Sequence, residues 1–347
     1  MKRVAECLYQ NESSKTYFAL VKKNGQQTKR SLKTQDRKLA ERRLREFREQ
    51  MAELSTEPGD RRLKFSSLSE RWLTISNAGL KPSSQRRNQL IVSGLSNCFR
   101  DKLVANINRI DCENWAAKRI ETVSSRTFNY DLQVLKRIMR YAVDTGIMLR
   151  SPADSLKPRK DPPKAILVPT RSQFDKLIQT LEDMTSLDAR SRHAIELVKL
   201  LAYSGMRLGE ATRIIWSEID LDQGTFTVSG GDVGTKNGEV RIIPLFPGLR
   251  HFLEGLLSKR LIINTTDKVV FTKTARTAIE SACRKSGLPK FDHHCLRHFF
   301  ASNAIENGVD FKTIAAWLGH KDGGLLVSKR YGHLRDTHSH EMAKLMV

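Results

Sequence analysis

Residues 293–302 read HHCLRHFFAS, and this stretch predicts a helix in the C-terminal half of the chain. A helix that begins near Asp292 places His294 and Arg297 on one face, because residues three apart are neighbours on a helix. That face is expected to line a phosphate pocket, whereas the flanking histidines are expected to be surface or packing residues. Cys295 lies inside the motif, where a redox or metal role competes with the simpler interpretation of a small buried apolar residue.

Two basic motifs precede this stretch. In SGMRLGEATR, residues 204–213, Arg207 follows the end of a predicted helix, and Glu210 can brace the guanidinium or cap the next helix. In TKNGEVRIIPL, residues 235–245, Lys236 lies at the turn between two predicted strands. Lys236 can approach a leaving oxygen on a mobile hairpin, or it can be an ordinary exposed lysine.

Two further motifs follow it. In WLGHKD, residues 317–322, Gly319 is suited to end a helix and to expose His320 beyond it. The imidazole can then bond a phosphate oxygen or help to deprotonate a tyrosine. SKRYGH, residues 328–333, carries Tyr331 beside a lysine and an arginine, which favours a phenolate. The other tyrosines fall within strand or helix patterns, where aromatic packing explains them.

These residue types, in this order, fit an attack on a phosphodiester. Negative charge gathers on the non-bridging oxygens in the transition state, and the guanidinium forks of Arg207 and Arg297 can stabilise it. The leaving sugar oxygen needs a proton, the attacking group must lose one, and the attacking group must survive as a covalent link. Lys236, the two motif histidines and Tyr331 can fill these roles.

The ordered set resembles the tyrosine recombinases and, within them, the phage and prophage integrases. The resemblance covers nearly the whole chain and is strongest in residues 165–347. It implies that Tyr331 forms a 3′-phosphotyrosyl link and releases a 5′-hydroxyl that attacks the partner strand. Tyr331 follows His320 by eleven positions, slightly more than is usual, and the glycine pair at 323–324 is interpreted as a small loop insertion. The implied catalytic residues are Arg207, Lys236, His294, Arg297, His320 and Tyr331.

The same resemblance implies the partners. Double-stranded DNA attachment sites are the expected substrate, a tetramer on two duplexes the expected assembly, and DNA-bending and directionality proteins the candidate accessory factors. No cofactor is expected, because metal-dependent nucleases hold hard cations with clustered carboxylates, and Asp292 and Asp322 alone do not make such a cluster. The expected role is to integrate or excise a mobile element such as a prophage.

Composition indicates a nucleic-acid partner independently. A chain of 347 residues with a formal net charge of +22 predicts two or three domains and strong attraction to polyanions. No apolar run reaches the length of a membrane span and the N-terminus lacks a signal-peptide core, so we expect the bacterial cytoplasm and association with the nucleoid. The 5 cysteines are scattered, which predicts reduced thiols and no structural zinc.

The first 57 residues predict a small sheet with one helix. Strand patterns at 4–9, 16–22 and 28–32 surround an Asn-Gly hairpin signal at 24–25, and a helix is expected to start at Thr34 or Asp36. This three-stranded arrangement resembles the arm-type DNA-binding module of integrases, although a solvated basic surface is the alternative. The predicted DNA contacts are Lys22, Lys23, Lys29 and Arg30.

Residues 64–157 predict an all-helical domain. Helical patterns cover 68–78, 83–95, 111–122 and 125–144, as in the core-binding domain of the family. Two helix starts are rich in phosphate-binding groups, part of which serve as caps. The predicted DNA contacts there are Lys81, Ser83, Arg86, Arg87 and Arg126.

A linker rich in proline and charge, residues 158–169, precedes a mixed α+β, mainly helical catalytic domain at 165–347. Its amphipathic tail, residues 337–347, can dock on a neighbouring protomer or on its own domain. Two other functions stay open. A type IB topoisomerase-like enzyme shares the chemistry but reseals the original strand, and a non-catalytic DNA-binding regulator needs the charge alone.

Overall fold

The computed structural model describes residues 1–23, 26–52, 54, 60, 62–162, 167–185, 189–230, 234–235, 238–260, 264–325 and 327–328. The chain forms two compact units, Met1–Pro163 and Lys164–Val347, and the boundary falls inside the predicted linker. The hairpin tip at 24–25, Lys236 and Tyr331 lie outside the described residues, as does the tail. Among the described residues, no helix is long and apolar enough to cross a membrane.

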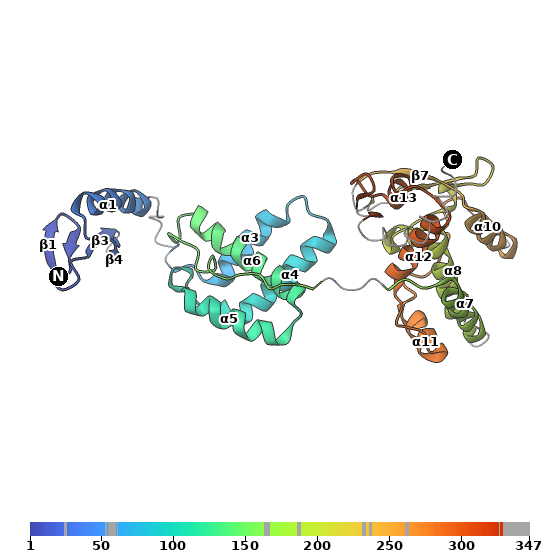
Figure 1. Cartoon of the computed structure of the whole chain (residues 1–347), viewed down its shortest axis with the longest axis horizontal. Helices are drawn as coiled ribbons and strands as arrows, with labels where there is room; N and C mark the ends of the chain where they lie inside the picture. The colour runs from blue at the N-terminus through green and yellow to red at the C-terminus, as the bar shows by residue number, and fades with distance from the viewer. Residues whose placement is uncertain are drawn as a thin grey trace, which may run out of the picture. The chain divides into compact units, whose positions relative to one another are not determined.

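The N-terminal unit begins with an antiparallel sheet of four strands in sequence order, β1 (Lys2–Ala5), β2 (Leu8–Gln10), β3 (Tyr17–Lys23) and β4 (Gln26–Ser31). The prediction of three strands was wrong, because a turn at Cys7, with φ of 60°, divides the first predicted strand in two. α1 (Arg37–Ala52) runs along one face of the sheet (Figure 1). The predicted helix start is confirmed, since an Asp36 carboxylate oxygen accepts the Leu39 N–H at 2.6 Å.

A helical bundle with its own core follows in the same unit. It consists of α3 (Phe65–Asn77), α4 (Pro82–Phe99), η1 (Val104–Asn106), α5 (Arg109–Thr122) and α6 (Ser125–Asp144). The four predicted helices are confirmed, with each end within four residues of the prediction. Aromatic rings form the centre of the core, with centroid distances of 6.4 Å from Phe99 to Trp115 and 5.8 Å from Trp115 to Phe128.

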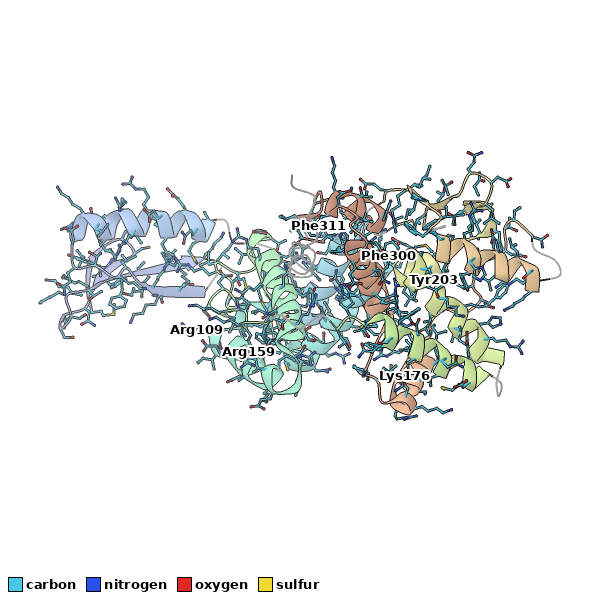
Figure 2. All side chains as sticks on the ribbon, turned by 45° about the vertical axis from the view of Figure 1, so that its right-hand side comes forward. Arg109, Arg159, Lys176, Tyr203, Phe300 and Phe311 are labelled. Carbon is cyan, nitrogen blue, oxygen red and sulfur yellow. The ribbon has the colours of Figure 1, made fainter. Side chains whose placement is uncertain are left out.

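The beginning of the predicted linker is attached to this bundle. The Asn129 side chain on α6 donates to the Arg159 carbonyl and accepts the Arg159 N–H, both at 2.8 Å (Arg159 is labelled in Figure 2). A side-chain amide that pairs with both groups of one peptide residue imitates a strand contact. Residues up to Arg159 therefore belong structurally to the bundle.

The C-terminal unit is mainly helical with one small sheet. Its helices include α7 (Arg171–Thr185), α8 (Ala189–Ser204), α9 (Leu208–Ala211), α10 (Pro247–Lys259), α11 (Arg276–Ser286), α12 (His293–Glu306) and α13 (Phe311–Leu318). After η2 (Trp216–Glu218), the strands β5 (Ile219–Asp220), β6 (Thr225–Val228) and β7 (Arg241–Pro244) pair antiparallel in this order. The sequence patterns predicted α8, β6, β7, α12 and α13, but not β5, α10 or α11.

The packing of α8 against α12 depends on Gly205. This residue ends α8 with a φ of +64°, and a Cβ atom there would lie 2.5 Å from the Phe300 ring on α12 (Phe300 is labelled in Figure 2). Glycine therefore lets the backbone reach α12 closely. The chain that leaves α8 is placed directly beside the first turns of α12.

Truncation of Phe128 to alanine is expected to destabilise the bundle by about 3–5 kcal/mol, because its ring is almost fully buried and leaves a cavity. Hydrogen exchange of peptides from α5 and α6 measures the loss. Tyr130→Ala on the same helix serves as control, since Tyr130 is 40% exposed and its removal should change protection little. Equal losses in both variants would contradict the assignment of Phe128 to the core.

Candidate active site

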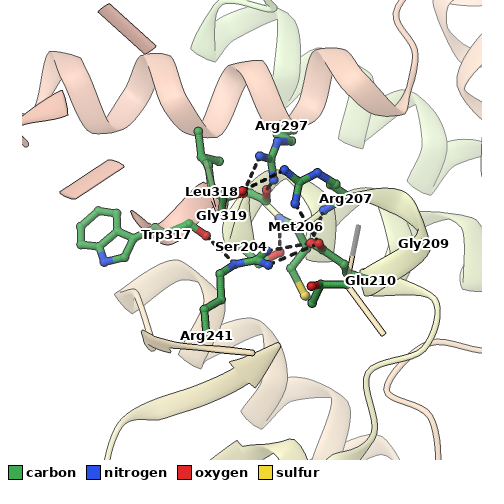
Figure 3. A network of polar contacts seen from close by, with 12 residues as sticks. Ser204, Met206, Arg207, Gly209, Glu210, Arg241, Arg297, Trp317, Leu318 and Gly319 are labelled. Carbon is green, nitrogen blue, oxygen red and sulfur yellow. Dashed lines mark hydrogen bonds and ion pairs between the residues drawn. The ribbon is translucent and has the colours of Figure 1, made fainter. Parts of the chain in front are cut away.

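Three guanidinium groups converge on the C-terminal end of α13. The carbonyl of Trp317 accepts from Arg241 Nε at 2.9 Å, that of Leu318 from Arg297 Nη2 at 2.6 Å, and that of Gly319 from Arg207 Nη2 at 3.1 Å (Figure 3). The last carbonyls of a helix lack partners within the helix and carry the negative end of its dipole. Gly319 ends α13 with a φ of +67°, as predicted, so these carbonyls are turned toward the arginines.

Glu210 holds two of the three arginines. Its carboxylate accepts the Arg207 N–H at 2.9 Å and Arg207 Nη1 at 3.0 Å, and it accepts Arg241 Nη2 at 2.7 Å and Nη1 at 3.3 Å. The sequence left open whether Glu210 braces the guanidinium or caps the next helix, and it does both. Burial alone would raise the pKa of this carboxyl, but the hydrogen bond and charge of Arg241, together with Arg207, lower it to about 2.

Arg297 is 4% exposed and is fixed from three sides. Besides the Leu318 carbonyl, it donates to the Gly205 carbonyl at 2.6 Å and to His320 Nε2 at 3.1 Å. Because a guanidinium can only donate, His320 Nε2 accepts, and the neutral ring carries its proton on Nδ1. Burial lowers the pKa of Arg297 to about 9, the charge of Arg207 lowers it as well, and Glu210 opposes both.

The charges at this site do not cancel. Three guanidinium groups face one carboxylate, which leaves an excess of two positive charges among these four groups. Repulsion between buried like charges is relieved when an anion enters. The arrangement is therefore suited to a phosphate group, whose oxygens guanidinium forks can meet in pairs.

An open pocket of about 730 Å³ lies against this cluster. Arg207, His294 and Arg297 line it together, as the sequence predicted, and His320 joins them through its bond to Arg297. Asp292 caps α12 by accepting the N–H groups of His294 and Cys295. Lys236 and Tyr331 are outside the described residues, so their catalytic roles stay predictions.

The other residues of the HHCLRH motif have structural contacts. His293 Nε2 accepts the Ala275 N–H at 2.9 Å, and burial lowers its pKa, which keeps that nitrogen free of a proton. His298 is buried with its ring centroid 4.3 Å from that of His294. Burial raises the pKa of Cys295 to about 11, so the thiol stays protonated and acts as a small buried group. The described residues contain no group of three potential metal ligands.

The strand pattern of the stretch VRIIP does not by itself mark Arg241 as a site residue. An arginine that alternates with apolar residues in a short strand is a usable signal, because a charge on the inward face of a strand requires a partner. Its partner Glu210 lies 31 positions earlier, and the sequence alone does not link the two.

Known proteins resemble this chain in sequence and in fold. Residues 168–338 match the Phage integrase family. Tyrosine recombinase XerC of Pseudomonas savastanoi pv. phaseolicola is 27% identical over 224 residues, which cover 62% of this chain and 72% of that protein. XerC of Lactobacillus delbrueckii subsp. bulgaricus is 25% identical over 246 residues, which cover 67% and 80%. The C-terminal part of the chain, residues 168–338, belongs to this family of tyrosine recombinases. It is thus an enzyme that cleaves DNA strands and rejoins them at specific sites.

Solved structures show the same fold as this recombinase. A lambda integrase dimer bound to a COC′ core site has a TM-score of 0.65 at 18% identity and covers 95% of this chain and 96% of that one. The Tn1549 transposon integrase in complex with a circular intermediate DNA has a TM-score of 0.64 at 17% identity and covers 81% and 99%. The mostly helical fold with small antiparallel sheets is common to them.

The predicted DNA contacts of the recombinase's N-terminal sheet fall on two faces. Lys22 and Lys29 are exposed, and the Lys29 ammonium lies 5.1 Å from the Phe18 ring centroid. Lys23 Nζ instead donates to the Ala52 carbonyl at 2.7 Å. Arg30 stacks on the Phe47 ring of α1 at 4.9 Å. The contacts of Lys23 and Arg30 with α1 explain these two residues without DNA, whereas Lys22 and Lys29 stay predicted contacts.

The predicted contacts of the bundle occupy its surface. α4 starts with Pro82 after Lys81 and has no side-chain cap, so its exposed serines, Ser83 among them, do not serve as the N-cap. α6 is capped by Ser124, as part of its cluster was expected to be. The Arg87 guanidinium lies 5.2 Å from the Tyr130 ring centroid. Further exposed residues at these helix starts are Arg86 and Arg126.

Replacement of Glu210 by glutamine is expected to cost about 3 kcal/mol of unfolding free energy at pH 7, because one pKa unit corresponds to about 1.4 kcal/mol. Since the folded pKa of about 2 lies below the ordinary 4.5, this contribution is complete above pH 4.5 and is lost as pH falls through 2. Urea unfolding of wild type and Glu210→Gln across this range should therefore converge in acid.

Glu280→Gln is the control for this prediction. Glu280 also lies between two cations, Arg276 and Lys290, but it is on the surface, where such pairs contribute little. Two results would contradict the explanation by a buried carboxylate. One is a loss of unfolding free energy in Glu280→Gln as large as that in Glu210→Gln. The other is a loss in Glu210→Gln that stays unchanged below pH 3.

Proposed function

We propose that this tyrosine recombinase is the integrase of a mobile element such as a prophage, and that it joins and separates DNA attachment sites. The observation that carries the proposal is the excess of positive charge formed by Arg207, Arg241 and Arg297 around Glu210, with His294 and His320 beside it. Such a site accepts one phosphodiester and stabilises the charge that develops on it.

In the proposed reaction the Tyr331 oxygen attacks the scissile phosphorus, and the bond from phosphorus to the 5′ oxygen breaks. Arg207 and Arg297 hold the non-bridging oxygens. Lys236 gives a proton to the leaving 5′ oxygen, while His294 or His320 assists removal of the phenol proton. The 5′-hydroxyl of a partner strand then attacks the 3′-phosphotyrosyl link. The bond energy is conserved in that link, and we assign no cofactor to the reaction.

Architecture supports the integrase role over that of a chromosomal recombinase. The structural likeness to lambda integrase extends over 95% of this chain and 96% of that one, which includes the part of the chain before the catalytic domain. We infer that residues 1–57 bind arm-type sites, 64–157 bind the core site, and 165–347 perform the chemistry. The solved neighbours include a lambda integrase tetramer bound to a Holliday junction, and we infer a tetramer on two duplexes here. DNA-bending and directionality proteins are further candidate partners in the bacterial cytoplasm.

The decisive experiment is covalent capture. A nicked suicide substrate should carry a DNA site that the protein itself has selected from a random pool. Wild type is expected to form an adduct that survives a denaturing gel, and Tyr331→Phe is expected to form none, because the nucleophilic oxygen is missing, while its DNA affinity stays within about twofold. Tyr130→Phe is the control, since it removes an exposed hydroxyl outside the site.

Three results would redirect the proposal. An adduct of unchanged amount with Tyr331→Phe would remove Tyr331 from the nucleophile role. Adducts whose strands are resealed without products joined between two duplexes would favour a topoisomerase-like enzyme, and site-specific binding without any adduct would favour a regulator.

A further inference from the structure

We propose that Arg241 is a positioning residue that fixes the β6–β7 hairpin, and with it Lys236, against Glu210 and the end of α13. The inference rests on the proposed function, in which Lys236 protonates the leaving 5′ oxygen. Arg241 itself need not touch the DNA. Its proposed effect is to fix the position of the proton donor relative to the arginines that are proposed to bind phosphate.

The contacts of Arg241 extend from the hairpin into the active site. Its side chain is 11% exposed and binds both oxygens of Glu210, at 2.7 and 3.3 Å, while Nε donates to the Trp317 carbonyl at 2.9 Å (Figure 3). A guanidinium that engages a carboxylate with two bonds has a defined orientation as well as position. Arg241 thus connects β7 with α9 and α13.

The strand pattern shows why this residue faces inward. Val240 and Ile242, its neighbours in the chain, are 62% and 69% exposed, whereas Ile243 is fully buried. Because successive side chains of a strand point to opposite faces, Arg241 shares the inward face. A buried charge is costly unless it is paired, so its presence there depends on the site that it binds.

Other contacts hold the base of the hairpin on both sides of Lys236. The Ser229 hydroxyl donates to Glu218, and a Cβ atom on Gly230 would lie 2.3 Å from the Gly234 backbone. Thr235, which directly precedes Lys236, is 3% exposed and donates to the Glu239 carbonyl at 2.7 Å. These contacts are internal to the sheet and its loop. Arg241 is the described residue of β7 that joins this rigid base to the arginine cluster.

Removal of Arg241 should slow the protonation of the leaving 5′ oxygen more than it weakens phosphate binding. Arg207 would keep its bonds to the Glu210 carboxylate at 3.0 Å and to the Gly319 carbonyl at 3.1 Å. Arg297 would keep its bonds to the backbone of Gly205 and Leu318. The hairpin would lose its connection to both, and a displacement of about 1 Å at a reacting group can cost about 100-fold in rate.

A leaving group that needs no proton isolates this step. Suicide substrates are prepared with the scissile phosphate linked to a 5′ oxygen or to a 5′ sulfur, because a thiolate leaves unprotonated far more readily than an alkoxide. Cleavage rates and DNA affinity are measured for wild type, Lys236→Ala, Arg241→Gln and Arg241→Lys. Arg241→Gln is expected to cleave the oxygen substrate about 100-fold more slowly than wild type, and to cleave the sulfur substrate within about tenfold of wild type. The rate at which Arg241→Lys cleaves the oxygen substrate should lie between those of wild type and Arg241→Gln.

Arg260→Gln is the matched control. Arg260 is 15% exposed, pairs with Glu196 at 3.2 Å and donates to the Val269 carbonyl at 2.9 Å, but it lies outside the pocket. It should lose comparable stability and cleave both substrates as wild type does. If Arg241→Gln does not fold, the same sulfur rescue is expected of Arg241→Lys.

The outcomes separate the inference from the function on which it rests. Sulfur rescue of Lys236→Ala but of neither Arg241 variant would overturn the positioning role and leave Lys236 as the proton donor. Failure of sulfur to rescue Lys236→Ala would instead remove Lys236 from that role, and the inference with it. An oxygen-substrate rate of Arg241→Gln equal to that of Arg260→Gln would also overturn the inference.

Discussion

The active site depends on the three carbonyls at the C-terminal end of α13. The carbonyl of residue 317 accepts a hydrogen bond from Arg241, that of residue 318 from Arg297, and that of residue 319 from Arg207. Guanidinium groups repel one another, and they stay together only where fixed dipoles and a carboxylate compensate them. The helix end supplies the dipoles and Glu210 the carboxylate. The compensation is incomplete by two charges, and this excess makes the site suited to a phosphate group.

Two glycines make this geometry possible. Gly319 adopts a left-handed conformation that ends α13, and an added Cβ atom there would lie 3.1 Å from the Arg241 guanidinium. Gly205 brings the end of α8 against Phe300, which places its carbonyl within reach of Arg297. A side chain at either position would separate the arginines from the carbonyls that hold them. The electrostatic compensation of the arginines at this site therefore depends on the backbone conformation of these two glycines.

The fixed arginines of this site bear on the chemistry of a tyrosine recombinase. Arg297 and Arg241 are largely buried and are each held by several hydrogen bonds, whereas the proposed proton donor Lys236 and the proposed nucleophile Tyr331 lie outside the described residues. A rigid phosphate site can be formed before DNA binds, so its preorganisation costs nothing at the moment of reaction. The proton donor must in addition be held in register with that site, and Arg241 is the connection that the fold provides for this purpose.

The sequence by itself determined the local elements and the identity of most of the site. Helix starts at Asp36 and Asp292 and helix ends at Gly205 and Gly319 follow from local rules of capping. The set of Arg207, His294, Arg297 and His320 is instead what the resemblance to the tyrosine recombinases implies. The division of the first strand at Cys7 was missed, because a non-glycine residue with positive φ has no reliable local signal. The sequence patterns did not predict α10 and α11.

Only the tertiary structure decided which charges are paired. Lys23 and Arg30 looked like Lys22 and Lys29 in the sequence, yet they bind α1, because alternation along a strand sends neighbours to opposite faces. Arg241 looked like an ordinary strand residue, yet it meets Glu210 and Trp317 from distant parts of the chain. Local rules reach a few residues along the chain, whereas the partner of a buried charge is set by which elements the fold brings together.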